Sequence, residues 1–518
     1  MLVKTYCAAV NGLEVTTVTI EVSLTRGIKF HLTGMADIAV KESHDRIAAA
    51  LRNTGFKFPS GDVTVNMAPA DLRKEGSSYD LPLAIALLAA SGKVDDFALK
   101  DYMIVGEMGL DGNLQPVRGA LPISILARKE HFKGLIVPKQ NAREAAVVNN
   151  LDVYGMENIT EVVNFFNGDD SYKPVYVDTR KEFYDHQSDF DLDFADVRGQ
   201  ENVKRALEVA AAGGHNLIMV GPPGSGKSMM AKRLPSILPP LSLSESLETT
   251  QIHSIAGKLA TNSTLISQRP FRSPHHSISQ AALVGGGSNP QPGEISLAHN
   301  GVLFADELPE FNKTTLEVLR QPLEDRHITI SRVKYTIDYP CSFMFVAAMN
   351  PCPCGYYNDP THNCVCTPGQ IQRYLNKISG PLLDRIDIQV EITPVPFDEI
   401  SKTQPGEPSA AIRERVIKAR KIQEERYAEY KGVHCNAQMS ERLMHQFAEP
   451  DEQGLELLRM AMKKLNLSAR AYSRILKVAR TIADLDGSEH VQSSHIAEAV
   501  SYRNLDRADW ADMKFSKG

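Results

Sequence analysis

The sequence has little that would place the protein in a membrane or in an oxidising compartment. Its longest apolar run, Leu81 to Ala90, is shorter than the ~20 residues that a membrane-spanning helix needs, and it indicates a buried helix instead. No apolar stretch of signal-peptide length follows Met1. Of the 7 cysteines, four crowd between positions 352 and 366, which favours metal chemistry in a reducing compartment over a disulfide framework. We therefore expect a cytoplasmic protein with no membrane partner.

Positive charge is not in excess either. The formal net charge is −6, so any contact with nucleic acid must come from local basic patches and not from the whole surface. The hydrophobic share of 42% and the charged share of 23% are ordinary for a soluble globular chain. With about 150 residues per domain as a guide, a chain of 518 residues predicts roughly three domains.

One short stretch carries the clearest chemical signal. A glycine-rich run with the pattern G-x-x-x-x-G-K-S follows the apolar residues 216–220 and precedes a helix-compatible stretch. Its members are Gly221, Pro222, Pro223, Gly224, Ser225, Gly226, Lys227 and Ser228. Such a loop turns backbone N–H groups towards phosphate oxygens, while the lysine supplies a charge to the β- and γ-phosphates and the serine offers a hydroxyl to Mg²⁺. A chance glycine turn explains neither the strand before it nor the helix after it. The chain is therefore predicted to bind ATP with Mg²⁺.

Acidic and amide side chains end two later apolar runs. Asp306 and Glu307 follow the run 301–305. In a P-loop enzyme the first acid at such a strand end holds the Mg²⁺ shell, and the second orients or deprotonates the attacking water. The run 342–348 leads to Asn350, which is either a sensor of the γ-phosphate or a plain turn residue before Pro351.

Two arginines are candidates for stabilising the charge that develops in phosphoryl transfer. Arg385 stands just ahead of a predicted strand. Presented to the nucleotide of a neighbouring subunit, it would work only across a subunit boundary, and it therefore predicts a ring. Arg470 opens a helix in the C-terminal region and is suited to reach the phosphates of its own subunit. By residue type alone, both arginines could equally form surface ion pairs.

Together these motifs resemble those of the magnesium-chelatase-like AAA+ ATPases, in the branch known as the ComM/YifB family. The resemblance covers essentially the whole chain and rests on the P-loop and on the runs 271–276 (FRSPHH), 305–310 (ADELPE), 348–355 (AMNPCPCG), 381–387 (PLLDRID) and 468–471 (SARA). It implies a homohexameric ring that hydrolyses ATP and acts on single-stranded or branched DNA. It further implies helicase and branch-migration activity in natural transformation or recombination. The roles of Glu307, Asn350, Arg385 and Arg470 follow more firmly from this resemblance than from residue type.

The N-terminal third alternates strand-like and helix-like stretches and resembles the proteolytic domain of Lon-type proteases, an α+β fold of the ribosomal S5 domain 2 type. In that family a serine follows a Lys-Asp/Glu-Gly-Pro run, and a later lysine activates it. Ser78 occupies the serine position, after Lys74-Glu-Gly-Ser, whereas Pro122 takes the lysine position. Because proline has no amine to serve as a base, we expect a Lon-like scaffold without peptidase activity. Ser78 is then a helix N-cap or a loop residue.

The expected fold class is α/β, with a Lon-like α+β domain, a central P-loop AAA+ α/β domain and a C-terminal helical lid. We assign residues 1–168 to the Lon-like, ChlI-type domain, 169–195 to an acidic linker, 196–397 to the ATPase core, 398–505 to the lid and 506–518 to a tail.

Two insertions in the ATPase core bear on the substrate. The longer one contains the run 269–276 and the flexible glycines 285–287. The second, 326–338, alternates like a β-hairpin with Arg332 and Lys334 near its tip. In the resembling family both elements line the pore of the ring, where basic groups would meet DNA phosphates without reading bases. The alternative is a hairpin whose exposed face is simply charged.

The clustered cysteines form two C-x-C pairs, Cys352 with Cys354 and Cys364 with Cys366. Four thiolates satisfy a tetrahedral Zn²⁺, and the loop between the pairs is long enough to bring them together. C-x-C pairs are less typical of zinc than C-x₂-C pairs, and His362 could replace one sulfur. The alternatives are free buried thiols or a redox pair. A zinc site here would staple a loop that has no core of its own and could couple nucleotide state to the substrate face.

Three functions remain open on the sequence. The leading one is a hexameric ATP-driven DNA motor. The second is a protein-remodelling AAA+ ATPase with a non-proteolytic Lon-like domain, since the loss of a peptidase does not exclude unfolding. The third is the motor subunit of a metal chelatase, although nothing in this chain resembles a metal-inserting subunit.

Overall fold

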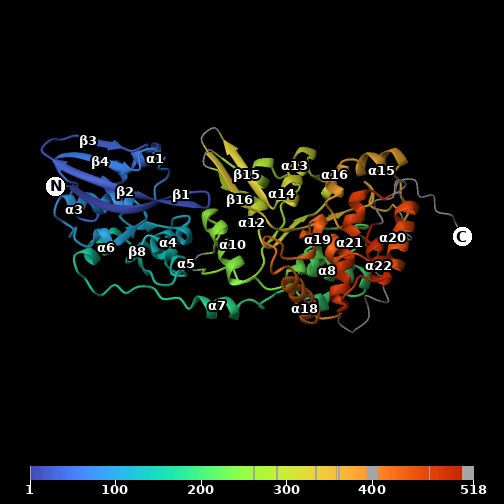
Figure 1. The fold of residues 1–518 in the computed structure, drawn as a ribbon. Helices are drawn as coiled ribbons and strands as arrows, with labels where there is room; N and C mark the ends of the chain where they lie inside the picture. Colours follow the sequence, from blue (N-terminus) through green and yellow to red (C-terminus); the bar gives the residue numbers. More distant parts are fainter. Residues whose placement is uncertain are drawn as a thin grey trace.

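The computed structural model describes residues 2–260, 263–287, 290–332, 335–357, 359, 362–393, 406–465 and 467–503. The structure is mixed α/β, with one large sheet in the N-terminal part and a second around the P-loop. These two parts lie side by side in an elongated molecule, and the C-terminal helices cover the end far from the N-terminus (Figure 1). Along these described ranges, no helix combines the length and the apolar character needed to cross a membrane.

The N-terminal sheet has seven strands in the order β3-β4-β2-β1-β5-β8-β9. In the middle of the sheet, β2 is antiparallel to both of its neighbours, β1 and β4. On one side β3 pairs parallel with β4, and on the other side β1, β5, β8 and β9 are all parallel. The strands are β1 (Leu2–Asn11), β2 (Glu14–Thr25), β3 (Phe30–Thr33), β4 (Asp62–Ala68), β5 (Tyr102–Ile104), β8 (Gly134–Pro138) and β9 (Asp152–Met156).

The apolar run expected to form a buried helix does so. It is α3 (Asp80–Ala90), in which every residue is buried. The helix packs against β1 and β2, so it has no solvent-facing side and needs no amphipathic period. The other longer helices of this part are α2 (Ser43–Asn53), α4 (Ala120–Lys129) and α6 (Ile159–Phe166).

The ATPase sheet has five strands, all parallel, in the order β11-β14-β17-β10-β18. They are β10 (Leu217–Val220), β11 (Phe271–Arg272), β14 (Val302–Ala305), β17 (Met344–Met349) and β18 (Ile388–Glu391). The strands β10, β14 and β17 are buried throughout, which explains why their sequences are continuous apolar runs and not alternating ones. Because parallel strands share one direction, the loops after β10, β14 and β17 meet at the same edge of the sheet.

A helical layer follows the ATPase sheet in the chain. It contains α18 (Ser409–Tyr427), α19 (Glu441–Phe447), α20 (Glu452–Leu465), α21 (Ala469–Leu485) and α22 (Ser493–Ser501). The helices α18 and α21 pack against α8 (Glu201–Gly213), the helix that precedes the P-loop strand (Figure 1). One hydrophobic core therefore runs from the face of the sheet into this helical layer.

The N-terminal part is anchored to the ATPase part through α10 (Leu243–Ile255). This helix packs against α4, and Leu121, Val147 and Val148 form a small apolar cluster whose partly buried neighbours include Leu247 on α10. Beside it, Ser254 at the end of α10 donates its hydroxyl to the buried carboxylate of Glu144 and accepts a bond from the backbone of the N-terminal part. The junction thus has an apolar and a polar component.

The domain boundaries at 168 and 195 stay predictions, and the boundary at 397 and the tail 506–518 lie outside the described residues. The residues after 168 do not leave the N-terminal part at once, because Val177 is buried with its hydrophobic core. The short helix α7 (Thr179–Asp185) then crosses the lower side of the molecule towards the ATPase part (Figure 1).

Candidate nucleotide-binding site

The glycine-rich loop joins β10 to α9 (Lys227–Arg233), as the sequence predicts. Gly224 and Gly226 have φ angles of 77° and 88°. Residues with a side chain rarely adopt such a backbone conformation, so the loop needs glycine at these points. A Cβ on Gly221 would lie 2.5 Å from the carbonyl oxygen of Ile392, so this glycine is required by a close approach. The loop therefore has the backbone freedom that a phosphate cradle demands.

Lys227 lies inside this loop. Its ammonium donates to the carbonyl oxygens of Gly221 at 2.7 Å and Pro222 at 2.8 Å, and to Asn350 Oδ1 at 3.2 Å. Burial lowers the pKa of Lys227, and the carboxylates of Asp306 and Glu307 act in the opposite direction. The ammonium is thus held at the P-loop by acceptors that phosphate oxygens could replace.

Ser228 and Asp306 meet across the sheet edge. Ser228 Oγ donates to Asp306 Oδ2 at 2.6 Å, although 77 residues of chain lie between them. Hydroxyl and carboxylate oxygens are the hard ligands that Mg²⁺ takes in nucleotide sites, usually together with water and phosphate. This donor set fits Mg²⁺ bound with ATP, with Ser228 and Asp306 as the protein's contribution.

Glu307 has an unusual backbone and one side-chain partner. Its φ of 51° lies in the left-handed region, and its N–H donates to Asp306 Oδ1 at 3.0 Å. The carboxylate is more than half exposed, and its Oε2 lies 3.5 Å from His276 Nδ1. His276 belongs to the run 271–276, part of the insertion that lines the pore in the resembling family, but the sequence assigns this histidine no role of its own. Only the folded chain shows that this histidine faces the second acid.

Asn350 stands between the loop and the acids because of the strand order. It follows β17, the strand that separates the P-loop strand β10 from the acidic strand β14. From this middle position its side chain accepts the bond from Lys227. The structure therefore brings together Lys227, Ser228, Asp306 and Asn350, with Glu307 on the exposed side.

Arg385 lies elsewhere. Its guanidinium donates to the carbonyl oxygens of Arg320 at 3.1 Å and Pro381 at 2.7 Å, and it pairs with Glu324. It precedes the first residue of β18, whereas the P-loop follows the last residue of the parallel neighbour β10. The two are separated by a strand of four residues, or about 13 Å. Arg385 is thus at the opposite edge of the sheet from its own P-loop.

Arg470 is at that same opposite edge, against the expectation that it reaches its own subunit's phosphates. Its Nη1 lies 2.9 Å from Asp384 Oδ2, and its side chain is 67% exposed. Arg470 and Arg385 line one pocket of about 190 Å³, which Arg474 and Lys477 also line. The physical reason is the docking of α21 on α8, which the helix periodicity of α21 does not specify.

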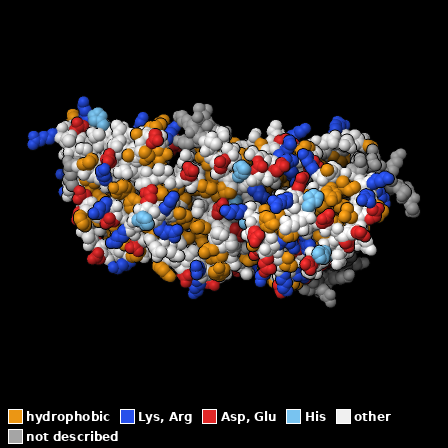
Figure 2. Space-filling model, in the orientation of Figure 1, with side chains coloured by type: hydrophobic (Ala, Val, Ile, Leu, Met, Phe, Trp, Pro, Cys, Tyr) orange, Lys and Arg blue, Asp and Glu red, His pale blue; other side chains and the backbone are white. Residues whose placement is uncertain are grey.

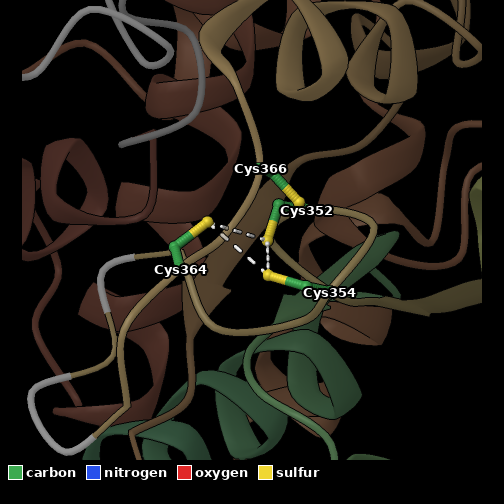
Figure 3. A group of neighbouring side chains, drawn as sticks. All are labelled: Cys352, Cys354, Cys364 and Cys366. Atoms are coloured by element: carbon green, nitrogen blue, oxygen red, sulfur yellow. Dashed lines mark hydrogen bonds between the residues drawn. The ribbon is translucent and has the colours of Figure 1, made fainter.

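The four clustered cysteines converge in space, as Figure 3 shows. Cys352 Sγ lies 3.3 Å from Cys354 Sγ and 3.7 Å from Cys364 Sγ, and Cys354 and Cys364 are 3.6 Å apart. With Cys366, all four sulfur atoms lie within 4.8 Å of one another. Four sulfurs around Zn²⁺ at about 2.3 Å would be ~3.8 Å apart, so the cluster fits zinc, whereas a disulfide needs about 2.05 Å. His362 stacks on Tyr356 instead of joining the sulfurs.

The proposed DNA contacts are only partly described. The hairpin forms from β15 (His327–Arg332) and β16 (Tyr335–Pro340), and Arg332 pairs with Tyr335 at its far end. Lys334 lies outside the described residues. The inward face of the hairpin is buried, and a Cβ on Gly12, in the turn between β1 and β2, would meet Ile337 at 2.3 Å. The hairpin is thus packed against the N-terminal part.

Ser78 occupies the position that resembles a protease nucleophile, and no lysine is among the described residues that line its pocket. Ser78 lies in the loop before Tyr79, the cap of α3, and lines a pocket of about 480 Å³. The lining of this pocket in the described chain includes arginines but not lysine. Lys74 is buried and donates to the carbonyl oxygen of Met67 at 2.9 Å, and Pro122 is buried in α4. Among the described residues that line this pocket, none offers Ser78 a side-chain amine.

Three family models match the chain one after another. The description Subunit ChlI of Mg-chelatase applies to residues 20–141, Magnesium chelatase, subunit ChlI to 193–400, and Magnesium chelatase, subunit ChlI C-terminal to 406–503. Together with the parallel sheet and the P-loop site, these matches define a magnesium-chelatase-like AAA+ ATPase domain.

Individual relatives narrow the class. The chain is 45% identical to competence protein ComM of Haemophilus influenzae over 504 residues, which cover 97% of each chain. It is 44% identical to YifB of Escherichia coli, an uncharacterized protein, over 499 residues and 96% of each chain. A shorter similarity of 30% identity over 157 residues links it to Lon protease 2 of Bacillus subtilis. The chain belongs to the ComM/YifB family of magnesium-chelatase-like AAA+ proteins.

Proposed function

We propose that the chain is an ATP-hydrolysing motor that works on DNA as a homohexameric ring, with helicase or branch-migration activity. The ATPase part rests on one observation above the others: Lys227 and Ser228, Asp306, and Asn350 converge at one sheet edge from three separate stretches of the chain. Bound ATP supplies the phosphoryl group, and bound Mg²⁺ neutralises the charge that develops on it.

Each residue at this edge of the sheet has a separate role in ATP binding and hydrolysis. Lys227 holds the β- and γ-phosphates, and Ser228 and Asp306 bind the Mg²⁺ shell. Glu307 orients the attacking water and takes its proton, because its carboxylate is the exposed one of the two acids. Asn350 is the polar group that distinguishes the presence of a γ-phosphate, since its amide lies against Lys227.

The ring follows from the two arginines. Arg385 and Arg470 cannot reach the P-loop of their own chain from the opposite edge of the sheet, yet both line one pocket with Arg474 and Lys477. In this pocket the four cations lie beside the carboxylates of Glu324, Asp384 and Glu441. The triphosphate of a neighbouring subunit is the anion that phosphoryl transfer would place there, in competition with these carboxylates for the arginines. We assign both arginines to the neighbour's nucleotide, which makes a closed ring the functional unit.

DNA as the substrate is supported by the relative named competence protein ComM, which matches along almost the whole chain. Within the structure, the hairpin of β15 and β16 brings Arg332 to its far end, where a basic group would meet phosphates. The cytoplasm is the compartment we propose, because clustered unpaired thiols persist where the environment is reducing.

The test is displacement or migration of a strand in forked and four-way DNA by the purified chain with ATP. We expect strand exchange with ATP and none with Lys227→Ala, which keeps the chain's DNA-facing surface. Absence of strand exchange together with ATP-dependent unfolding of a tagged protein would replace this proposal with the protein-remodelling function. The Lon-like part favours the remodelling alternative, and the pocket around Ser78 predicts that no peptide is cleaved in either case.

A further inference from the structure

The cysteine loop touches the P-loop directly. Gly355, in the turn just after Cys354, has a φ of 88° and lies against Pro223. A Cβ built on Gly355 would come within 2.6 Å of Pro223 Cδ and 3.9 Å of Asn350 Cγ. These distances leave no room for a side chain, so the backbone of the cysteine loop forms one wall of the nucleotide loop.

The cysteine loop also lies close to the ATP site through Asn350. Cys352 comes two residues after Asn350, whose side chain accepts the bond from Lys227. On the other side of the cluster, α15 (Pro368–Leu375) carries the buried Tyr374, whose hydroxyl lies close to the backbone of Asn350. The segments before and after the cluster thus both lie next to Asn350 of the ATP site.

The described residues of the loop that carries the cluster are mostly exposed or partly exposed. Cys352 is buried, but Cys354, Cys364 and Cys366 are partly exposed, and Val365 between the last two is 82% exposed. Figure 3 shows that the four sulfur atoms point towards one another from two separate stretches of this loop. A loop without an apolar core needs a cross-link to keep one conformation, and a structural zinc site supplies one.

We propose that the four thiolates bind Zn²⁺ and that the metal-held loop braces the P-loop through Gly355 and Pro223. Nucleotide affinity then depends on metal occupancy. The inference rests on the proposed ATP site and adds to it a metal-dependent control. Because coupling between two binding sites is reciprocal, bound nucleotide must tighten zinc by the same factor by which zinc tightens the nucleotide.

The first test measures the two ligands without DNA and without turnover. Purified protein should contain one Zn²⁺ per chain, and removing it with a chelator should weaken binding of a fluorescent ATP analogue about tenfold. Readdition of Zn²⁺ should restore the affinity. In the other direction, saturating analogue should slow the release of Zn²⁺ to a colorimetric chelator. Cys364→Ser with Cys366→Ser should reproduce the stripped protein, and circular dichroism checks that each sample stays folded.

The second test addresses the contact itself. Gly355→Ala should keep its zinc and still bind the analogue more weakly, because its Cβ displaces Pro223. The matched control is Gly432→Ala, whose φ of 80° is similar but whose Cβ meets nothing within 4 Å. In a Pro223→Ala background, where the ring is absent, Gly355→Ala should cost less than in the wild type. An equal cost in both backgrounds would contradict the brace.

Three outcomes separate this inference from the proposed function. Protein that binds the analogue normally and takes up no zinc would overturn the metal site. Zinc that binds and leaves analogue affinity unchanged when stripped would overturn the brace. A zinc-loaded wild type that binds no nucleotide would overturn the ATPase and the brace together, whereas a failure of DNA stimulation alone would leave the zinc linkage standing.

Discussion

Arg470 Nη1 and Asp384 Oδ2 form an ion pair of 2.9 Å, and Asp384 stands next to Arg385 in the chain. One carboxylate thus ties a helix of the C-terminal layer to the segment that carries the other arginine. In the surface view of the molecule, basic and acidic side chains are mixed (Figure 2). No single-sign surface dominates that view, in keeping with the net charge of −6.

The first prediction concerns the two arginines. Arg385→Ala and Arg470→Ala should each lower the ATPase kcat about 10³-fold, because each removes a cation from a neighbour's reaction. Mixing either variant with Lys227→Ala should restore activity, since a ring then contains junctions at which an intact P-loop faces an intact arginine. The steady-state ATPase rate of mixtures measures this directly. Arg459→Ala, at an exposed ion pair with Glu456, is the matched control and should behave as the wild type. Mixtures that stay inactive would show that the arginines act within their own chain.

A second prediction separates binding from turnover at the sheet edge. Lys227→Ala should lose ATP binding, because the charge at the β- and γ-phosphates is gone. Glu307→Gln should bind ATP as the wild type does and lose about 10²–10⁴-fold in kcat, because the amide cannot take a proton from water. Equilibrium binding of a fluorescent analogue, measured beside the ATPase rate, distinguishes the two. Equal loss of binding in both variants would mean that the roles assigned to them are wrong.

The third prediction is a pH dependence of folding stability that arises from Lys477, which lines the same pocket as Arg385 and Arg470. Burial, with Arg474 close by, lowers the pKa of Lys477 to about 8 from an ordinary value of 10.5. Below pH 8 Lys477 carries its proton in both the folded and the unfolded chain, so the cost of burying the charged ammonium lowers folding stability in full. Between the two pKa values the unfolded chain binds more protons than the folded one, so stability rises with pH.

Lys477→Met removes this titration. The wild type should therefore gain stability relative to the variant as the pH rises through about 8 to 10, by about 1–3 kcal/mol after allowance for solvent screening. Thermal midpoints of both proteins, taken side by side across that range, report the difference and cancel the titration of other groups. A constant difference at every pH would contradict the lowered pKa.

The fourth prediction concerns the junction between the N-terminal and ATPase parts. Ser254→Ala removes the hydroxyl that donates to Glu144, a buried carboxylate whose pKa burial raises. Leaving that acceptor short of a donor should weaken the junction by about 1–3 kcal/mol. Hydrogen exchange should then rise in α10 and α4 while the ATPase sheet stays protected. Ser244→Ala, on the exposed face of the same helix, is the control. Unchanged exchange in both variants would show that the hydrogen bond from Ser254 to Glu144 does not hold the junction.

The sequence predicts well those features that depend on neighbouring residues. The P-loop, the strand before it and the helix after it follow from one continuous stretch, and Asp306 follows from an apolar run that ends in an acid. The α3 helix follows from its apolar length. In each case the local pattern and the tertiary environment favour the same structure.

Features that depend on how separate elements dock could not be derived in this way. The periodicity of α21 predicts a helix but not that it packs on α8 and turns Arg470 towards Asp384. His276 and Glu307 follow two different strands of the sheet and approach each other only in the folded chain. The close approach of Gly355 to Pro223, which leaves no room for a side chain, likewise appears only in the folded chain. Parallel sheets make such contacts at one edge without leaving a local signature.

The central claim is that DNA is the substrate of the motor, and its most direct test is the ATPase rate with and without single-stranded and branched DNA at two salt concentrations. The account predicts that DNA raises the rate and that the stimulation falls as salt rises, because phosphate contacts release counterions. An intact ATPase whose rate no DNA changes at either salt concentration would contradict the account and favour a protein substrate.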